Sequence, residues 1–189
     1  MKEGRLLLYI IRHGKTDWNT RHKLQGRTDI PLNEEGRRMA ERAALEIRDT
    51  PFDICFCSPL IRARETAEIL LEGRNIPMEF DDRLAEMSFG SYEGFENIFS
   101  KPDCPLYAFF KDPGRYTGTP GGAESLDSLF ERTGAFLREK ALPLHAQGKS
   151  VLIVGHGAMN SSIICRLRGL ERKDFWSEPI ENCKLKRLL

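Results

Sequence analysis

The chain has 189 residues, and its 29 Lys and Arg side chains nearly balance 28 Asp and Glu, which leaves a net charge of +1. This balance gives no overall attraction to nucleic acid or to an acidic membrane surface, and we expect neither as a partner. With 40% hydrophobic and 30% charged residues, the composition is typical of one globular domain that covers residues 1–189.

An apolar run from Leu6 to Ile11 predicts the first strand, and the run is followed by Arg12-His13-Gly14. It is shorter than the apolar core of a signal peptide and much shorter than a membrane span. A polar loop follows from Lys15 to Leu32. Asn33 then suits an N-cap, and the two glutamates after it suit the positive end of a helix that we expect to run to about Arg48.

A second buried strand is predicted over residues 52–57, which are mostly apolar. Ser58 and Pro59 after it are typical of an N-cap and a first helical residue, and they predict a helix from Leu60 to about Leu71. Residues 77–80 predict a short third strand.

The second half of the chain contains a long amphipathic pattern that predicts a helix from Glu124 to about His145, and Pro143 should break or kink its end. Another apolar run, from Val151 to Val154, predicts a strand that is followed by Gly155-His156-Gly157. The remaining predicted elements are a helix from about Met159 to Leu167, a helical turn near Phe175 and an edge strand from Lys184 to Leu189.

Strands that alternate with helices are typical of a parallel sheet with both faces covered. The sequence therefore predicts an α/β fold, a three-layer α/β/α sandwich with a mainly parallel sheet. Segment 95–122 stands apart as an insertion rich in aromatic residues, Pro and Gly. We interpret it as a small cap: one reading is a hydrophobic cluster that folds a long loop onto the domain, and the other is a cover over a pocket that shapes substrate choice. The two readings are compatible.

The five cysteines are scattered along the chain without a CxxC pair. They are Cys55, Cys57, Cys104, Cys165 and Cys183. Their odd number and their spacing favour free thiols that act as small apolar residues in a reduced, cytoplasmic protein. A zinc site is the alternative, but the ligand spacing of such sites is missing, and we expect neither a metal nor a cofactor.

Two histidines carry the strongest chemical signal. His13 and His156 each follow a predicted strand and precede a glycine, and the carboxyl ends of parallel strands are where α/β folds place their sites. Arg12 adds a cation beside the first histidine. Arg62 falls in the first turn of a predicted helix, where a cation is disfavoured unless an anion lies nearby. Together these residues predict a cationic pocket that handles phosphate. The alternative for Arg62 is an ion pair with Glu65 or with a loop carboxylate. The side chains predicted to lie on the surface are His22, His145 and Arg64.

Five motifs in the same order along the chain resemble those of the histidine phosphatase superfamily, which includes the cofactor-dependent phosphoglycerate mutases. They are Arg12 to Asn19, Leu24 to Leu32, Ser58 to Ala67, Arg83 to Gly94 and Gly155 to Gly157. Glu65 stands where the family commonly has Gln. The stretch from Met87 to Gly94 looks most like the branch of α-ribazole phosphatases and broad-specificity phosphatases.

The resemblance implies that His13 is the nucleophile and forms a phosphohistidine, with its other ring nitrogen held by a backbone carbonyl. Arg12, Arg62 and His156 would grip the phosphoryl oxygens. The two arginines should lower the pKa of His13, because like charge disfavours the imidazolium. Glu86 would protonate the leaving group and then activate water, and the alternative is that Glu86 only pairs with an arginine.

Weaker assignments follow from the same resemblance. The further phosphate-binding residues that it implies are Asn19, Gln25, Gly26 and Gly157. Glu93 is the second candidate for the acid, although its place beside Gly94 suggests a structural role. Residues 120–125 resemble a Pro-Gly-Gly-Glu-Ser motif with Ala123 as an extra residue, which leaves the position of Glu124 open.

The resemblance implies a metal-independent, acid-type phosphomonoester hydrolase that acts on small phosphorylated metabolites. A phosphoglycerate mutase is the alternative, but residues 86–90 lack the Arg and Tyr of family mutases, and segment 95–122 offers only Lys101, Lys111 and Arg115 as basic residues. A non-catalytic member that binds phosphorylated metabolites or proteins is disfavoured because the catalytic set is complete. A metal-dependent hydrolase is disfavoured because an acidic ligand cluster is missing. The sequence is compatible with a monomer or a dimer.

Overall fold

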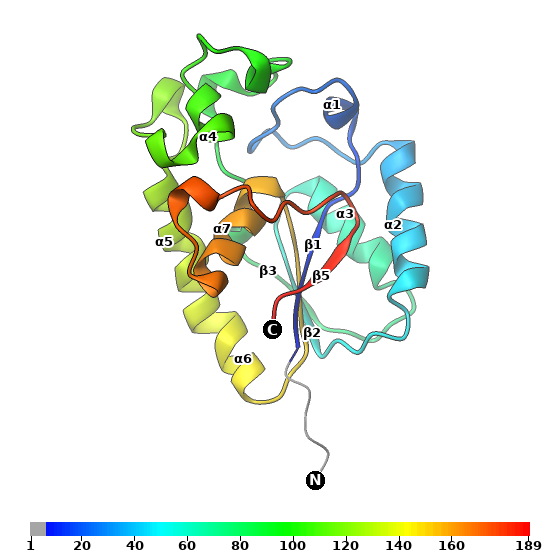
Figure 1. The fold of residues 1–189 in the computed structure, drawn as a ribbon. Helices are drawn as coiled ribbons and strands as arrows, with labels where there is room; N and C mark the ends of the chain where they lie inside the picture. Colours follow the sequence, from blue (N-terminus) through cyan, green and yellow to red (C-terminus); the bar gives the residue numbers. More distant parts are fainter. Residues whose placement is uncertain (1–6) are drawn as a thin grey trace.

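A sheet lies at the centre of the computed structural model, which describes residues 7–189 (Figure 1). Within these residues the sheet has five strands in the order β3-β2-β4-β1-β5. The strands are β1 (Leu8–Arg12), β2 (Ile54–Cys57), β3 (Met78–Phe80), β4 (Val151–Gly155) and β5 (Leu185–Arg187). β1 to β4 run parallel, and β5 pairs antiparallel with β1 at the edge. The predicted mainly parallel sheet and its C-terminal edge strand are confirmed, whereas the predicted strand start at Leu6 lies outside the described residues.

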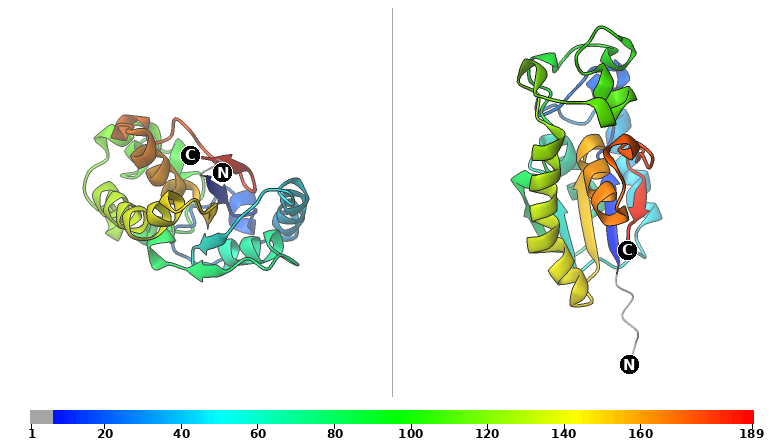
Figure 2. Two further views of the ribbon diagram at one scale, coloured as in Figure 1. Left: turned by 90° about the horizontal axis from the view of Figure 1, so that it is seen from below. Right: turned by 60° about the vertical axis from the view of Figure 1, so that its left-hand side comes forward.

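Helices cover both faces of this sheet, as Figures 1 and 2 show. The α-helices are α1 (Asp17–Thr20), α2 (Glu34–Glu46), α3 (Ile61–Leu70), α4 (Tyr107–Lys111), α5 (Leu126–Phe136), α6 (Leu142–Ala146) and α7 (Gly157–Arg168). α2 and α3 lie on one face, and α5, α6 and α7 lie on the other, which confirms the three-layer prediction. In the part of the chain that the structure describes, none of these helices is long and apolar enough to cross a membrane.

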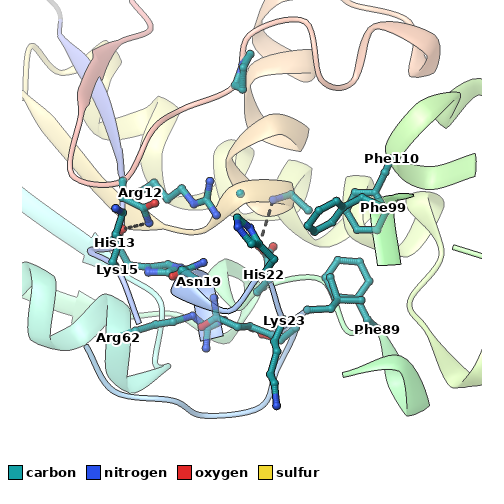
Figure 3. Close-up of a pocket in the computed structure, with 18 of the residues that line it drawn as sticks. Arg12, His13, Lys15, Asn19, His22, Lys23, Arg62, Phe89, Phe99 and Phe110 are labelled. Atoms are coloured by element: carbon teal, nitrogen blue, oxygen red, sulfur yellow. Dashed lines mark hydrogen bonds between the residues drawn. The ribbon is translucent and has the colours of Figure 1, made fainter. Parts of the chain in front are cut away.

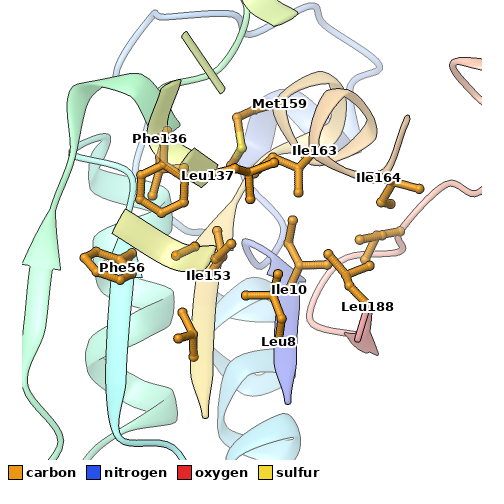
Figure 4. Close-up of a cluster of buried hydrophobic side chains, with 14 residues drawn as sticks. Leu8, Ile10, Phe56, Phe136, Leu137, Ile153, Met159, Ile163, Ile164 and Leu188 are labelled. Carbon is orange, nitrogen blue, oxygen red and sulfur yellow. The ribbon is translucent and has the colours of Figure 1, made fainter. Parts of the chain in front are cut away.

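The two layers of core follow from the alternation of side chains along the strands. Ile10 and Ile153 point to the face covered by Phe136 and Met159 (Figure 4), whereas Leu152 belongs to the core cluster on the opposite face. Because both faces are buried, these strands are apolar at nearly every position, which is why they were recognisable as continuous apolar runs.

The start of α3 differs from the prediction. Ser58 was expected to cap this helix, and that expectation is wrong: the helix begins at Ile61, and its N-cap Leu60 has an extended ψ of 136°. The free N–H of Ile61 is instead bonded by the carboxylate of Asp29, at 2.7 Å. Arg62 still falls in the first helical turn, as predicted, and the Ser58 hydroxyl accepts from the N–H of Leu60, at 3.3 Å, before the helix begins.

The long helix expected from Glu124 begins two residues later, after Ser125 as its N-cap. A π-helical turn, Leu137–Ala141, separates α5 from α6 and places Pro143 in the first turn of α6. Pro143 has no N–H to donate and its ring crowds the carbonyl four residues earlier, and the wider π turn accommodates both. Pro143 therefore interrupts the α-helical pattern as predicted, but the chain stays helical to Ala146. By contrast, the predicted N-cap of α2 is confirmed, since Asn33 accepts from the N–H of Gly36 at 2.8 Å.

Segment 95–122 folds into α4 and several short 3₁₀ turns above the carboxyl ends of the strands (Figures 1 and 2). Its apolar side chains form a third core cluster with residues from other parts of the chain. Phe109 lies fully buried at its centre and contacts Phe89, Phe175 and Trp176 at ring-centroid distances of 5.2 to 5.6 Å. The prediction of a hydrophobic cluster that folds this segment onto the domain is confirmed.

Candidate active site

A cavity of about 590 Å³ opens at the carboxyl ends of β1 and β4, beneath segment 95–122. Figure 3 shows Arg12, His13 and Arg62 on one side of it and three phenylalanines on the other. Of the nine predicted site residues, eight line the cavity: Arg12, His13, Asn19, Gln25, Gly26, Arg62, Glu86 and Gly157. The ninth, His156, is fully buried directly behind His13.

The pairing of β1 with β4 brings the two histidines together. Arg12 lies opposite Gly155 in the parallel register, and the N–H of His13 donates to the carbonyl of Gly155 at 2.9 Å. Each histidine is the residue after its strand, so both leave the sheet side by side, with ring centroids 5.2 Å apart. The expectation that these distant residues converge is therefore met.

His13 has one ring nitrogen committed to the backbone. Nδ1 donates to the carbonyl of Gly14 at 2.6 Å, because a carbonyl can only accept, and this leaves the lone pair on Nε2. Burial lowers the pKa of His13 well below its ordinary value, and the charges of Arg62 and Arg12 lower it further. The sequence predicted the effect of the two arginines, but burial is the larger cause.

His156 is oriented by a residue that the sequence analysis assigned elsewhere. Its Nε2 lies 2.7 Å from the Oγ of Ser58, which follows the neighbouring strand β2. Burial and the nearby charge of Arg62 lower the pKa of His156 well below its ordinary value. Ser58 is thus a hydrogen-bond partner of the second imidazole and not a helix cap.

The two arginines contribute positive charge without carboxylate partners. Arg62 is fully buried and donates to the carbonyls of Gly26, at 2.7 Å, and Thr28, at 3.0 Å. Burial lowers the pKa of Arg62 to about 10. Neither Arg12 nor Arg62 forms an ion pair with any carboxylate from Leu7 to Leu189, and Glu65 pairs with Arg37 instead.

Three further polar atoms in this group are buried and have no hydrogen-bond partner among the described residues. They are Nε of Arg12, Nε of Arg62 and Nδ1 of His156. Unpaired buried donors are uncommon in folded proteins, since each costs free energy unless a ligand or water satisfies it. Two guanidiniums with spare donors suit an anion, and above all a phosphoryl group, whose oxygens match the guanidinium fork.

Glu86 sits at the N-terminus of α7 rather than in an ion pair. Its Oε1 accepts from the N–H groups of Met87, at 2.9 Å, and Met159, at 3.0 Å, and its Oε2 accepts from Ala158, at 3.2 Å. These N–H groups lack partners within the helix, and they hold the carboxyl group of Glu86 in place. The alternative that Glu86 only pairs with an arginine is wrong for residues 7–189.

The weaker site residues are held by a local network in the loop after β1. Thr16 donates its backbone N–H to Oδ1 of Asn19, at 3.1 Å, and its hydroxyl to Oε1 of Gln25, at 2.9 Å. Gly26 has a positive φ of 56°, and a Cβ on it would overlap the carboxylate of Glu93. Only glycine fits this turn beside Arg62 without strain.

The two other acidic candidates have structural partners. Glu93 accepts from the N–H groups of Arg27, Thr28 and Phe89 at 2.8 to 3.0 Å, so it ties two loops together. Glu124, whose position the sequence left open, is nearly buried and bonded by Arg132. Neither lines the cavity.

Several cavity residues were missed by sequence reasoning. Asn182 donates its side-chain N–H to the carbonyl of His13 at 2.7 Å, and Trp176 and Pro179 line the far side. His22 is exposed, as predicted, but it also lies at the cavity mouth (Figure 3). No local pattern marks these residues, because they reach the site only through the folding of distant segments.

The fold and the site together define an α/β protein in which Arg12, His13 and Arg62 line a cavity at the carboxyl end of the sheet, with His156 buried beside His13. The chain belongs to the histidine phosphatase superfamily (branch 1), whose family model matches residues 8–189. This confirms the predicted family. A phosphohistidine mechanism is general to the superfamily.

Among similar proteins are both phosphatases and mutases. The uncharacterized phosphatase PhoE of Bacillus subtilis is 35% identical over 165 residues, which cover 85% of this chain and 76% of that protein. A 2,3-bisphosphoglycerate-dependent phosphoglycerate mutase of Cytophaga hutchinsonii is 31% identical over 170 residues, covering 89% of this chain and 80% of that protein. The crystal structure of the α-ribazole phosphatase from Shigella flexneri matches with a TM-score of 0.82 and 26% identity, covering 96% of this chain and 89% of that chain.

Proposed function

We propose that this protein hydrolyses small phosphomonoesters through a phosphohistidine on Nε2 of His13, without a metal ion. The observation that carries the proposal is the state of that imidazole. Its Nδ1 is bonded to the backbone and its pKa is lowered by burial and by two arginines, which favours a neutral ring with a lone pair on the free nitrogen.

In the first step, Nε2 attacks phosphorus while the bond from phosphorus to the ester oxygen breaks. Arg12, Arg62 and His156 stabilise the charge on the three non-bridging oxygens, which is the main contribution that a protein makes to phosphoryl transfer. The departing oxygen takes a proton from the carboxylic acid of Glu86.

In the second step, the Glu86 carboxylate takes a proton from water, and the water oxygen attacks phosphorus. The phosphorus–nitrogen bond breaks, which returns a neutral His13 and releases inorganic phosphate. Asn19, Gln25 and the backbone N–H groups of Gly26 and Gly157 are proposed as further donors to the phosphoryl oxygens, because all four residues line the same cavity.

Hydrolysis is favoured over mutase chemistry by the lining of the cavity. Of the three basic residues in segment 95–122, Lys111 reaches the cavity, whereas Arg115 pairs with Asp112 at 3.2 Å and Lys101 is exposed elsewhere. A mutase has to hold a phosphorylated acid in two orientations and keep water away. Aromatic side chains, rather than several basic ones, line the side of the cavity next to segment 95–122.

The low pKa of His13 also supports an acid-type phosphatase, since the nucleophile would stay neutral below the pH at which a free histidine becomes charged. We further infer a cytoplasmic setting, which suits a protein whose five cysteines are free thiols.

Release of phosphate from p-nitrophenyl phosphate in excess EDTA tests the proposal. We expect turnover that is lost in His13→Ala and retained in His145→Ala, a histidine on α6 outside the cavity. Activity that needs added metal would overturn the metal-independent mechanism. Conversion of 3-phosphoglycerate to its 2-isomer faster than its hydrolysis would overturn the assignment as a phosphatase.

A further inference from the structure

The cavity is larger than the group that its cationic side would hold. Its volume of about 590 Å³ lies in the range of pockets that enclose a whole small-molecule ligand. Arg12, His13 and Arg62 occupy one side, and the space between them and segment 95–122 lies beside Phe89, Phe99 and Phe110 (Figure 3). The leaving group of the substrate would fill that space.

Four side chains from different parts of the chain form an aromatic wall on this side: Phe89, Phe99, Phe110 and Trp176. The wall is built before any ligand arrives. Phe110 stacks on Trp176 with an interplanar angle of 12° and a centroid distance of 6.2 Å, and the indole N–H of Trp176 donates to the carbonyl of Phe109 at 2.8 Å. A preformed aromatic surface binds a flat apolar group at a low cost in conformational entropy.

Charge on the cavity lining is strongly one-sided. Glu86 is the one carboxylate among the described lining residues, whereas the lysines that line the cavity are Lys15, Lys23 and Lys111. Two of these lysines are already paired, Lys15 with Glu35 at 2.7 Å and Lys23 with Glu96 at 3.6 Å.

Lys111 is different. It forms no ion pair within residues 7–189, and its neighbour Asp112 pairs with Arg115 instead. Lys111 is the last residue of α4, and it lines the same cavity as the aromatic wall. One ammonium group matches one negative charge, such as a carboxylate.

We propose that the substrate of this protein is an aryl phosphomonoester that carries a carboxylate, with its ring against the aromatic wall and its carboxylate facing Lys111. This inference rests on the proposed function, because the scissile phosphate must occupy the position between Arg12, His13 and Arg62. It adds the chemical class of the leaving group.

Phosphonates test each part without turnover, since the enzyme cannot hydrolyse their carbon–phosphorus bond. Binding of methylphosphonate, phenylphosphonate and 4-carboxyphenylphosphonate to the wild-type protein is measured by calorimetry. We expect phenylphosphonate to bind about three- to tenfold more tightly than methylphosphonate, as aromatic contacts typically provide. We expect 4-carboxyphenylphosphonate to bind about two- to fivefold more tightly than phenylphosphonate at low salt. This difference in affinity should shrink as the salt concentration rises, because salt screens the charge of the exposed Lys111.

Two variants, each with a matched control, show which side chain is responsible for each gain in affinity. Lys111→Met keeps the apolar stem and removes the charge, and it should abolish the gain from the carboxylate, whereas Lys101→Met on the same segment should preserve it. Phe99→Leu should reduce the gain from the ring, whereas Phe80→Leu, an exposed residue on β3, should not. Thermal unfolding of each variant checks that the fold is intact.

Equal binding of the phenyl and methyl compounds would overturn the ring assignment. A carboxylate gain that is absent, or that persists in Lys111→Met, would overturn the anion assignment. If methylphosphonate and inorganic phosphate both fail to bind, the proposed function itself is wrong, and this outcome is separate from the other two.

Discussion

Arg132 and Glu124 meet in a double hydrogen bond, with Nε 2.7 Å from Oε1 and Nη2 2.9 Å from Oε2. The remaining Nη1 of Arg132 donates to the carbonyls of Arg83, at 2.6 Å, and Ala85, at 2.7 Å. Glu124 accepts in turn from the N–H of Ser88, at 3.3 Å. The pair therefore holds the chain on both sides of Glu86. Burial alone would raise the pKa of Glu124, but the hydrogen bond from Arg132 lowers it, so the pair stays charged.

This contact makes Arg132 a positioning residue for the proposed acid. The ammonium group of Arg132→Lys cannot form the double hydrogen bond that the guanidinium makes with Glu124. We expect kcat on an alkyl phosphate to fall about tenfold, which is part of the ~10²- to 10⁴-fold that general acid catalysis contributes. Hydrolysis of p-nitrophenyl phosphate should fall much less, because its leaving group is stable as an anion. Arg138→Lys, at an exposed position in the π turn that follows α5, serves as the control. Equal losses on both substrates would show a general structural effect and contradict the prediction.

The hydroxyl of Ser58 should matter because it is the hydrogen-bond partner of His156 Nε2. Ser58→Ala leaves a buried ring nitrogen unpaired, and we expect the free energy of unfolding to fall by about 1–3 kcal/mol together with a lower kcat/KM. Urea unfolding and steady-state kinetics measure the two effects. Ser58→Thr, which keeps the hydroxyl, should recover part of the activity, and Ser100→Ala on the surface should behave as wild type. Unchanged kinetics in Ser58→Ala would argue that His156 needs no such orientation.

The imidazole of His13 should titrate below the ordinary histidine pKa of about 6.5, since burial and two arginines disfavour its charged form. Side-chain NMR of the free protein, with His13→Gln to assign the signal, measures this directly. The ring should remain neutral, with its proton on Nδ1, at pH values where His13 in a short peptide is mostly charged. A midpoint at or above about 6.5 would remove the basis for an acid-type phosphatase.

Stability should also depend on pH through the same rings. The pKa values of His13 and His156 are both lowered in the folded state, so below about pH 6.5 the unfolded chain binds more protons than the folded protein. The free energy of unfolding should therefore fall as the pH drops below about 6.5, by up to about 1.4 kcal/mol per pH unit for each ring, and these rings should add no slope above it. Urea unfolding across this range provides the measurement, and His13→Gln should flatten the slope.

Gly26 and Gly73 form a matched pair for testing the turn beside Arg62. Both have positive φ values, of 56° and 71°, but a Cβ would overlap Glu93 at Gly26 and meet nothing within 4 Å at Gly73. Gly73→Ala should cost only about 1–2 kcal/mol of stability, as expected for a left-handed residue. Gly26→Ala should cost more and also lower activity, because Glu93 and the carbonyl that Arg62 contacts must shift. Equal effects of the two substitutions in thermal unfolding would contradict this.

The parts of the fold that depend on local pattern could be predicted from the sequence. The strands around Ile10 and Ile153 are apolar on both faces, and the polar loops between elements are distinct from them, so the sheet and the positions of His13 and His156 at its carboxyl end followed directly. The N-cap at Asn33 is equally local.

The errors and omissions arise where distant segments compete for the same group. Ser58 has the sequence context of a cap, but Asp29 takes over the helix N-terminus and the hydroxyl bonds His156. Asn182 and Trp176 lie in an irregular C-terminal stretch with no periodic pattern, and only tertiary packing brings them to the cavity. The π turn before Pro143 was also missed, because a proline indicates a break in the α-helical pattern but not which irregular turn accommodates it.

The contact between Asn182 and the carbonyl of His13 joins two segments that are 169 residues apart in the sequence. β5 then pairs with β1 beyond it, and β4 must already lie on the other side of β1. The pocket is therefore closed only when the segment from Asn182 to Arg187 has joined β1, so the two histidines by themselves do not complete it.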